Sequence, residues 1–222
     1  MNAAPVIAID GPSASGKGTV AQEVARRLGF NYLDSGSLYR LVGLAARSAN
    51  INPVDEPAVA ALAAALDVRF ENEDIYLNQK RVTDSLRSEE AGASASQVAA
   101  LPMVRHALLG RQRAFRVRPG LVADGRDMGS VVFPDAKLKI YLTADPEERA
   151  RRRYKQLIDK GMGANMAALL QDIKVRDERD SARAVAPLQK CSDAILIDTT
   201  KLSIDDAVAA VLAHYAGVTR VP

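Results

Sequence analysis

The sequence predicts an α/β protein in which a doubly wound parallel sheet forms the core and a second lobe is inserted into it. Two observations lead to this fold class. Short apolar runs alternate with helical patterns toward both ends of the chain, which is typical of parallel strands joined by crossover helices. In the middle of the chain, short alternating runs favour a small antiparallel sheet instead. We therefore expect a core formed by residues 1–37 and 101–222, and an insert at residues 38–100.

The first predicted strand and helix flank a glycine-rich loop. Pro5–Asp10 is an apolar run suited to a buried strand, and Thr19–Leu28 has apolar residues at helical spacing. Between them lies the pattern G-x-x-x-x-G-K, whose glycines let backbone N–H groups surround a phosphate while the lysine reaches over its outer oxygens. A helix that begins at this loop adds its N-terminal dipole. The residues expected to bind nucleotide phosphates are Gly11, Pro12, Ser13, Ala14, Ser15, Gly16, Lys17, Gly18 and Thr19.

The loop departs from the general pattern at Gly18, where a serine or threonine hydroxyl usually coordinates Mg²⁺. The hydroxyl comes one residue later, at Thr19, and the ending G-K-G-T resembles that of the nucleoside monophosphate kinases. We therefore expect Mg²⁺ to be held mainly by the phosphates of ATP and by water, with Thr19 near the ion through a water molecule.

The composition limits the class of protein. With 222 residues, of which 48% are hydrophobic, the chain can form one sizeable core and one inserted lobe. Its single cysteine, Cys191, excludes an internal disulfide, and the chain has no cluster of cysteine and histidine that would predict a zinc site. No secretion signal and no apolar run long enough to span a bilayer is found, so a cytoplasmic protein is expected.

The basic residues are mostly arginines. The net charge is only +3, but 21 of the 30 basic residues are Arg, whose planar guanidinium binds phosphate through two hydrogen bonds. This excess favours an anionic substrate, although genome composition produces the same excess. The positions of the arginines must decide between the two.

After the first helix, the sequence predicts a short strand, a turn at Asp34–Gly36 and a helix that ends near Asn50. Ser35, Tyr39 and Arg40 are spaced to line the opening turn of that helix, where a second anion could bind. A serine cap followed by a surface tyrosine and arginine is the commoner explanation of such a stretch.

The insert is expected to contain helices and a small sheet. Its short alternating runs favour an antiparallel meander at residues 68–71, 75–78 and 81–83. Helices are expected on either side of the meander, at residues 52–66, 89–100 and 103–115. On the last of these helices, the apolar stripe predicts that the more exposed side carries Arg105, His106, Gln112 and Arg113.

Charged residues follow the next predicted strand, Gly120–Ala123. In an open parallel sheet, ligands bind beyond the carboxyl ends of the strands, so Asp124, Arg126 and Asp127 are expected at the same edge as the glycine-rich loop. An ordinary Asp-Gly turn would not explain why the charged residues Arg126 and Asp127 follow it. We therefore interpret this segment as part of a ligand site.

The helix after the strand at residues 138–144 begins with an Asp-Pro pair and two glutamates, a strong helix-start signal. On it, Arg149, Arg152 and Arg153 share one face. Three cations on one face favour a lid that covers phosphate groups, at about residues 146–164, although a solvated basic face gives the same pattern.

The next long helix places Arg176, Asp180 and Arg183 on one face. A ladder of exposed ion pairs, worth only a few tenths of a kcal/mol per pair, is the simplest explanation of this spacing. The chain then continues with a strand at residues 194–198 and a helix that opens with a Ser/Asp capping box and ends at Gly217.

These features together resemble the bacterial cytidylate kinases, and the resemblance covers nearly the whole chain. It rests on the segments Ile9–Ser13, Leu33–Gly36, Ala95–Ala99, Arg111–Phe115, Asp124–Gly129 and Lys174–Asp180. The resemblance implies a doubly wound core with an inserted lobe that binds a nucleoside monophosphate (NMP) and contains the small antiparallel sheet. It also implies the reaction of ATP with CMP or dCMP to give ADP and CDP or dCDP.

The resemblance further implies roles for individual residues. Arg40 and Arg126 would hold the CMP phosphate, and Ser96, Arg105 and Asp127 would face the cytosine. The ribose hydroxyls would contact Arg176 and Asp180. The whole set implied for CMP is Ser35, Tyr39, Arg40, Ser96, Arg105, Asp124, Arg126, Asp127, Arg176, Asp180 and Arg183. The catalytic cations would be Lys17, Arg126, Arg149 and Arg153.

The chemistry of the reaction agrees with these residue types. A monophosphate acceptor is already anionic near neutral pH, so its attack on the γ-phosphoryl group needs alignment and charge neutralisation rather than a general base. An arginine-rich site without a catalytic histidine meets this need. Cytosine also offers an amino group that the Asp127 carboxylate can accept, whereas uracil presents a carbonyl there.

Two alternatives stay open. The same loop would serve a kinase for another small acceptor, such as UMP, AMP or shikimate. A basic ATP-dependent nucleic-acid-binding module is the alternative from another class, but the chain has only 5% aromatic residues for base stacking and no tryptophan. The partners expected are therefore ATP and CMP or dCMP, without nucleic acid or membrane, and the protein is expected to be a monomer.

Overall fold

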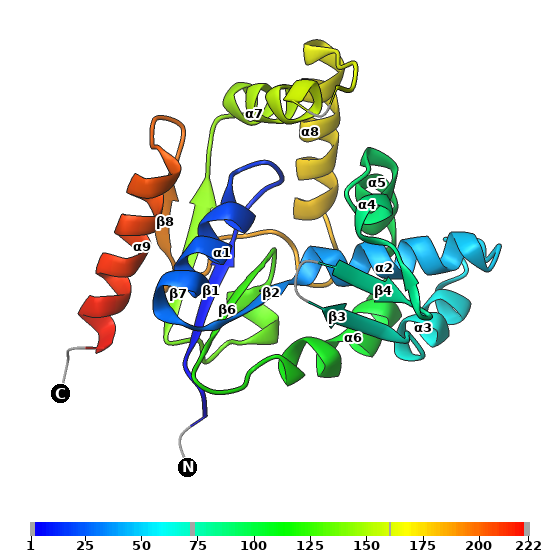
Figure 1. The fold of residues 1–222 in the computed structure, drawn as a ribbon, viewed down its shortest axis with the longest axis horizontal. Helices are drawn as coiled ribbons and strands as arrows, with labels where there is room; N and C mark the ends of the chain where they lie inside the picture. The colour runs from blue at the N-terminus through cyan, green and yellow to red at the C-terminus, as the bar shows by residue number, and fades with distance from the viewer. Residues whose placement is uncertain (1–2, 72–73, 160, 220–222) are drawn as a thin grey trace. The chain divides into compact units, whose positions relative to one another are not determined.

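The computed structural model describes residues 3–71, 74–159 and 161–219 (Figure 1). The chain divides into two compact units, residues 1–33 with 115–222 and residues 34–114. The second unit is longer than the insert expected from the sequence, because it includes the start of the second helix and all of the helix at residues 102–114. Residues 72–73 of the predicted meander and residue 160 of the predicted lid lie outside the described residues.

The first unit is built on a five-stranded sheet. Its strands are β1 (Val6–Asp10), β2 (Asn31–Asp34), β6 (Leu121–Gly125), β7 (Leu138–Thr143) and β8 (Ile195–Asp198), in the order β2-β6-β1-β7-β8. The central strand β1 pairs in parallel with β6 and β7, and β7 pairs in parallel with β8. All residues of β1 are buried, as expected for an inner strand of a parallel sheet covered on both faces. The predicted doubly wound parallel sheet is therefore confirmed.

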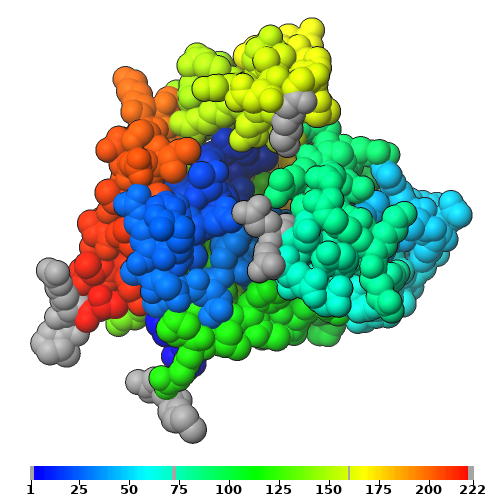
Figure 2. Space-filling view, in the orientation of Figure 1, coloured from blue at the N-terminus to red at the C-terminus, as the bar shows by residue number. Residues whose placement is uncertain are grey.

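The helices of this unit are α1 (Lys17–Leu28), α7 (Pro146–Asp159), α8 (Met166–Ser181) and α9 (Ile204–Thr219). Helices α1 and α9 pack against the sheet, whereas α7 and α8 pack against each other. Helices α1 and α9 lie side by side, as Figures 1 and 2 show, and Val24 and Val208 pack into one core cluster with Ile140 of β7. The end predicted for α9 was wrong, because Gly217 keeps a helical backbone and the helix continues to Thr219.

The second unit consists of helices and a three-stranded sheet. The helices are α2 (Ser35–Ser48), α3 (Glu56–Ala64), α4 (Thr83–Leu86), α5 (Glu89–Val98) and α6 (Pro102–Ala114). The strands are β3 (Val68–Glu71), β4 (Asp74–Leu77) and β5 (Lys80–Arg81), paired antiparallel in the order β3-β4-β5. The predicted antiparallel sheet is confirmed, but its last strand is shorter because Thr83 begins α4, with its hydroxyl 3.0 Å from the Asp74 carboxylate.

A helix start replaces the turn that the sequence predicted at Asp34–Gly36. Helix α2 begins directly after β2, at Ser35. The Asp34 carboxylate accepts hydrogen bonds from the Ser37 backbone N–H at 3.1 Å and from the Ser37 hydroxyl at 2.6 Å. An aspartate cap satisfies a backbone donor that the first helical turn would otherwise leave unpaired, so no separate turn is needed.

The exposed side predicted for α6 was wrong at two residues. Arg105 is 7% exposed and Gln112 only 1%, while His106 and Arg113 are exposed. Arg105 and Gln112 lie at i and i+7, on the same face of the helix as the buried Leu108. The prediction placed Arg105 on the exposed side because its side chain is charged. In the structure Arg105 lies over the aromatic ring of Tyr39, a contact that exists only in the folded protein.

Two short elements were not predicted, the helix α4 and a π-helical turn at Met128–Val132 (η1). Both are too short to give a periodic signal in a sequence. In the parts of the chain that the structure describes, no helix is long and apolar enough to cross a membrane.

Candidate active site

The glycine-rich loop between β1 and α1 has the backbone expected of a phosphate-binding loop. A Cβ atom on Gly11 would lie 2.0 Å from the Leu142 carbonyl oxygen, so only glycine fits there. Ala14 and Gly16 have φ angles of 56° and 90°, and the value at Ala14 is uncommon for a residue with a side chain. Lys17 is 9% exposed, and its amino group donates to the Pro12 carbonyl at 3.2 Å.

Two arginines of α7 hold other carbonyl groups of this loop. Arg149 is 3% exposed and donates to the Ser13 carbonyl at 3.2 Å, to the Ala144 carbonyl at 2.9 Å and to the Asp177 carboxylate at 2.6 Å. Arg152 donates to the Ser15 carbonyl at 3.2 Å. The alternative of a solvated basic face was therefore wrong for Arg149. Arg153, the third arginine of the predicted lid face, donates to Gln156 of its own helix at 3.1 Å.

Asp124 lies at the end of β6, close to the loop. It is 4% exposed, and the Tyr32 hydroxyl donates to its carboxylate at 2.6 Å. A Cβ atom placed on Gly18 would lie 3.5 Å from the same carboxylate oxygen, so Gly18 leaves the carboxylate facing the start of α1. Thr19 has an exposed side chain on the first turn of α1. The described residues contain no group of three or more His, Cys, Asp or Glu that could hold a metal ion alone.

Asp10, the last residue of β1, fixes the segment that follows β6. Its carboxylate accepts hydrogen bonds from the backbone N–H groups of Met128 and Gly129, both at 2.8 Å. Burial raises the pKa of Asp10 to about 7, although the two hydrogen bonds act in the opposite direction. Sequence reasoning missed this role; the available signal was a carboxylate at the end of a wholly apolar strand, directly before the loop.

Arg126, Asp180 and Arg183 form a buried cluster. Arg126 Nε donates to Asp180 Oδ2 at 2.8 Å, and Arg183 binds the other carboxylate oxygen. Asp180 is 1% exposed, so the explanation as an exposed ion-pair ladder was wrong for it. Asp127, next to Arg126, is also buried, and Arg176 is half-buried. The structure thus brings together residues that lie 54 positions apart in the chain.

The second unit contains the other residues implied for the nucleotide. The Arg105 guanidinium lies 5.5 Å from the centre of the Tyr39 ring, and it donates to the Ala99 carbonyl at 3.0 Å. Arg40 donates to the Leu86 carbonyl at 2.8 Å. Ser35 and Ser96 are both buried, at 3% and 2% exposure, at the start of α2 and on α5. Polar side chains are therefore gathered on α2, α5 and α6 of this unit.

A phosphate-binding loop at the central strand, with arginines and carboxylates after neighbouring parallel strands, defines the class of this protein as a P-loop phosphotransferase. The cytidylate kinase family profile matches residues 7–216. The chain belongs to the cytidylate kinase family.

Similar proteins agree with this assignment. The chain is 62% identical to a cytidylate kinase from Chromobacterium violaceum, 60% to one from Bordetella pertussis and 60% to one from Pseudomonas paraeruginosa. These alignments cover 94%, 95% and 96% of this chain, and 94%, 94% and 96% of the relatives. Among solved structures, an uncharacterized protein from Eubacterium ventriosum is similar in fold, with a TM-score of 0.51 and 14% identity over 96% of this chain and 98% of the other.

Proposed function

We propose that this protein transfers the γ-phosphoryl group of ATP to CMP or dCMP, forming ADP and CDP or dCDP. The observation that carries the proposal is the buried cluster of Arg126, Asp180 and Arg183, with the buried Asp127 next to Arg126 in the chain, in a member of the cytidylate kinase family. Arginine side chains suit the phosphate of an acceptor nucleotide, and buried carboxylates suit its amino and hydroxyl groups.

ATP would be bound by the loop residues Gly11–Thr19. Their backbone N–H groups and the N-terminus of α1 would surround the phosphates. Lys17 would exchange its bond to the Pro12 carbonyl for one to the outer phosphates. The segment at residues 146–164 would act as the lid.

The residues near the loop also fit Mg²⁺. Asp124 supplies one carboxylate beside Gly18, and Mg²⁺ is commonly bound through one or two carboxylates, water and substrate phosphates rather than by a site made only of protein groups. Thr19 would contact the ion through water. When bound, Mg²⁺ would neutralise charge on the phosphates of ATP. The Tyr32 hydroxyl keeps the Asp124 carboxylate oriented.

CMP would be recognised through groups specific to cytosine. Asp127 would accept a hydrogen bond from the cytosine amino group, and Arg105 and Ser96 would donate to the ring acceptors. Uracil would leave the Asp127 carboxylate facing a carbonyl oxygen, which a buried site discriminates against strongly. The remaining contacts would come from Ser35, Tyr39, Arg40, Asp124, Arg126, Arg176, Asp180 and Arg183.

Catalysis would rest on alignment and charge neutralisation. The acceptor phosphate is already anionic, so no group needs to remove a proton before it attacks the γ-phosphoryl group. The cations proposed around the transferred group are Lys17, Arg126, Arg149 and Arg153. Because all residues proposed for both substrates come from one chain, we propose that the protein acts as a monomer. We also propose a cytoplasmic location, where ATP and CMP are both present.

A coupled assay of ADP release tests the proposal. The protein would be given MgATP with CMP, dCMP, UMP, AMP or shikimate in separate reactions. CMP and dCMP should turn over far faster than the others, and Lys17→Ala should abolish transfer because its charge would no longer reach the phosphates. Faster turnover of UMP, AMP or shikimate would overturn the assignment of the acceptor, and no turnover with any of them would overturn the kinase function.

A further inference from the structure

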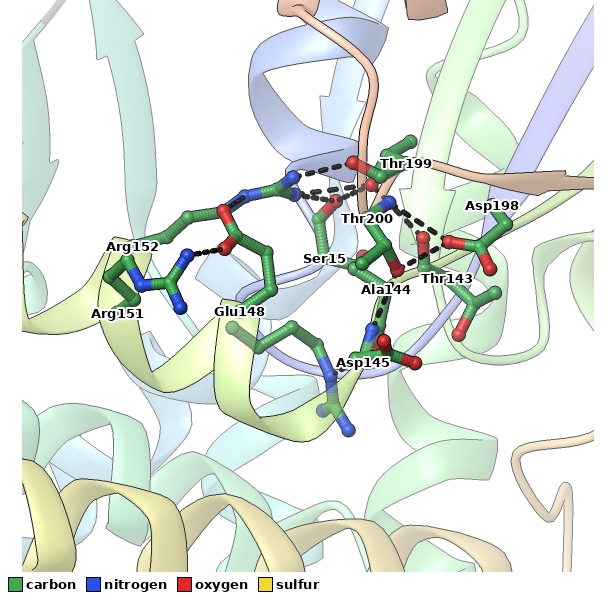
Figure 3. Close-up of polar contacts among 11 residues, drawn as sticks. Ser15, Thr143, Ala144, Asp145, Glu148, Arg151, Arg152, Asp198, Thr199 and Thr200 are labelled. Carbon is green, nitrogen blue, oxygen red and sulfur yellow. Dashed lines mark hydrogen bonds and ion pairs between the residues drawn. The ribbon is translucent and has the colours of Figure 1, made fainter.

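In the glycine-rich loop, hereafter the phosphate loop (Gly11–Thr19), the Ser15 carbonyl is contacted by two residues outside the loop, Arg152 of α7 and Thr199 after β8 (Figure 3). Arg152 Nη1 donates to the Ser15 carbonyl at 3.2 Å and to the Thr199 hydroxyl at 3.1 Å, and its Nη2 donates to the Thr199 carbonyl at 2.6 Å. The Thr199 hydroxyl lies 3.1 Å from the Ser15 carbonyl and 3.0 Å from the Thr143 carbonyl. Arg152 and Thr199, from distant parts of the chain, therefore both lie within hydrogen-bonding distance of one loop carbonyl, and the single hydroxyl proton of Thr199 is shared between the carbonyls of Ser15 and Thr143.

We infer that Arg152 and Thr199 are positioning residues of the phosphate loop, which orient the Gly16 N–H group for ATP without touching the nucleotide. In a trans peptide, the carbonyl and the following N–H point in opposite directions. A carbonyl of Ser15 that is fixed toward Arg152 and Thr199 thus directs the Gly16 N–H to the other side of the loop, where the motif binds phosphate. The inference rests on the proposed binding of ATP.

The loop needs such an anchor because of its own sequence. Gly16 has a φ angle of 90°, and glycine adopts positive and negative φ angles at similar cost. Rotation of the peptide between Ser15 and Gly16 is therefore poorly opposed by the glycine itself. That rotation would break the bonds from Arg152 and Thr199 to the Ser15 carbonyl, so these bonds oppose it.

The charge of Arg152 adds to this effect. A cation at the carbonyl end of a peptide polarises it, and a polarised peptide has a stronger N–H donor at its other end. Arg149 makes the equivalent contact with the Ser13 carbonyl, two residues earlier in the loop. Helix α7 thus supports the carbonyl side of the loop at two points, Ser13 and Ser15.

The neighbouring Arg151 provides a matched control. Arg151 and Arg152 lie on the same helix, and both pair with Glu148, at 2.6 and 3.1 Å (Figure 3). Their side chains differ in exposure, at 71% for Arg151 and 26% for Arg152. Only Arg152 has a hydrogen bond to the loop among those described for the two residues. A comparison of Ala variants therefore separates the loop contact from the ion pair with Glu148.

Calorimetric titration with ADP tests the inference without an acceptor. Arg152→Ala and Thr199→Val should each weaken ADP binding about tenfold or more, since each removes a hydrogen bond in a charged network. Arg152→Lys should recover only part of the loss, because an ammonium cannot replace the fork of the guanidinium. Thr199→Ser and Arg151→Ala should stay within about twofold of the wild type. In the double variant Arg152→Ala/Thr199→Val, the loss of ADP binding free energy should be smaller than the sum of the two single losses, because both residues act on the Ser15 carbonyl.

Specific outcomes would overturn the inference. Unchanged ADP affinity in Arg152→Ala would remove the role of that residue, and a loss in Arg152→Ala but not in Thr199→Val would make Arg152 a direct ligand of the nucleotide. Unfolding midpoints show whether each variant is folded. If Arg152→Ala does not fold, Thr199→Val still tests the inference, because valine keeps the shape of the threonine side chain. The ADP titration contains no CMP, so its result would still hold if CMP proved not to be the acceptor. In the folded variants, the KM for CMP should also stay within about twofold of the wild-type value.

Discussion

The Asp180 carboxylate accepts a hydrogen bond from Arg126 Nε at 2.8 Å, in a place where the two side chains are only 1% and 15% exposed. Arg183 binds the other carboxylate oxygen. Burial alone would raise the pKa of Asp180, but the positive charges of Arg126 and Arg183 outweigh burial and lower it. Asp180 is therefore ionised, and it serves as the anion that the two arginines share.

Replacing Asp180 with Asn should destabilise the protein. The amide keeps the shape of the side chain but removes the negative charge that Arg126 and Arg183 share, and breaking a buried ion pair costs about 3 kcal/mol or more. Urea denaturation measures the change. Asp172→Asn, at an exposed position of the same helix, is the control and should stay within about 0.5 kcal/mol of the wild type. Equal stability of the two variants would contradict the role of Asp180.

Asp10 should make the stability depend on pH. The pKa of its carboxyl is raised from 3.8 to about 7, so between these values the folded protein binds the proton more tightly than the unfolded chain. The stabilisation from this group is therefore fully present below the lower value and is lost as the pH rises through about 7, by an amount on the order of 4 kcal/mol. The free energy of unfolding of Asp10→Asn, measured by urea at pH 4.5, 6 and 7.5, should lack this decrease. Parallel curves for the two proteins would show that Asp10 titrates normally.

Two glycines of the same loop should respond differently to alanine. A Cβ atom on Gly11 would lie 2.0 Å from the Leu142 carbonyl oxygen, whereas the closest atom to a Cβ on Gly18 is 3.5 Å away. Gly11→Ala must displace backbone of β7 and should lower the unfolding midpoint by several degrees or prevent folding. Gly18→Ala should keep the midpoint within about 2 °C. Thermal unfolding followed by circular dichroism decides, and similar midpoints would refute the close contact at Gly11.

Asp127→Ala should reduce the preference for cytosine. The variant loses the acceptor proposed for the cytosine amino group, while the contacts to the phosphate stay. The ratio of kcat/KM for CMP to that for UMP should fall by about tenfold or more, mainly through slower CMP turnover. Circular dichroism confirms that the variant is folded, since Asp127 is 3% exposed. An unchanged ratio in a folded variant would place cytosine recognition elsewhere.

The parts of the fold that the sequence predicted well depend on local patterns. The strand β1, the glycine-rich loop and α1 follow one another between residues 6 and 28, and each has its own periodic or compositional signal. The capping box of α9 is of the same kind, and Asp206 N donates to Ser203 Oγ at 3.1 Å as predicted. Such features depend on few distant contacts.

The parts that the sequence did not predict depend on residues far apart in the chain. Arg152 and Ser15 are separated by 137 positions, and Thr199 and Ser15 by 184. A face of arginines on α7 indicated an anion, but in the structure Arg152 binds the backbone carbonyls of Ser15 in the loop and of Thr199 after β8. Arg105 was misplaced for the same reason, because only the packing of α2 near α6 in the second unit supplies Tyr39 as its partner.

The position of Asp180 also has a consequence for how the site treats simple ions. Arg126 and Arg183 never face solvent as a bare pair of positive charges, since a carboxylate of the protein already compensates them. Any incoming anion must compete with this internal counter-ion. We therefore expect inorganic phosphate and sulfate, which bring no base or sugar to add further contacts, to bind the two arginines more weakly than a ligand that carries a whole nucleotide.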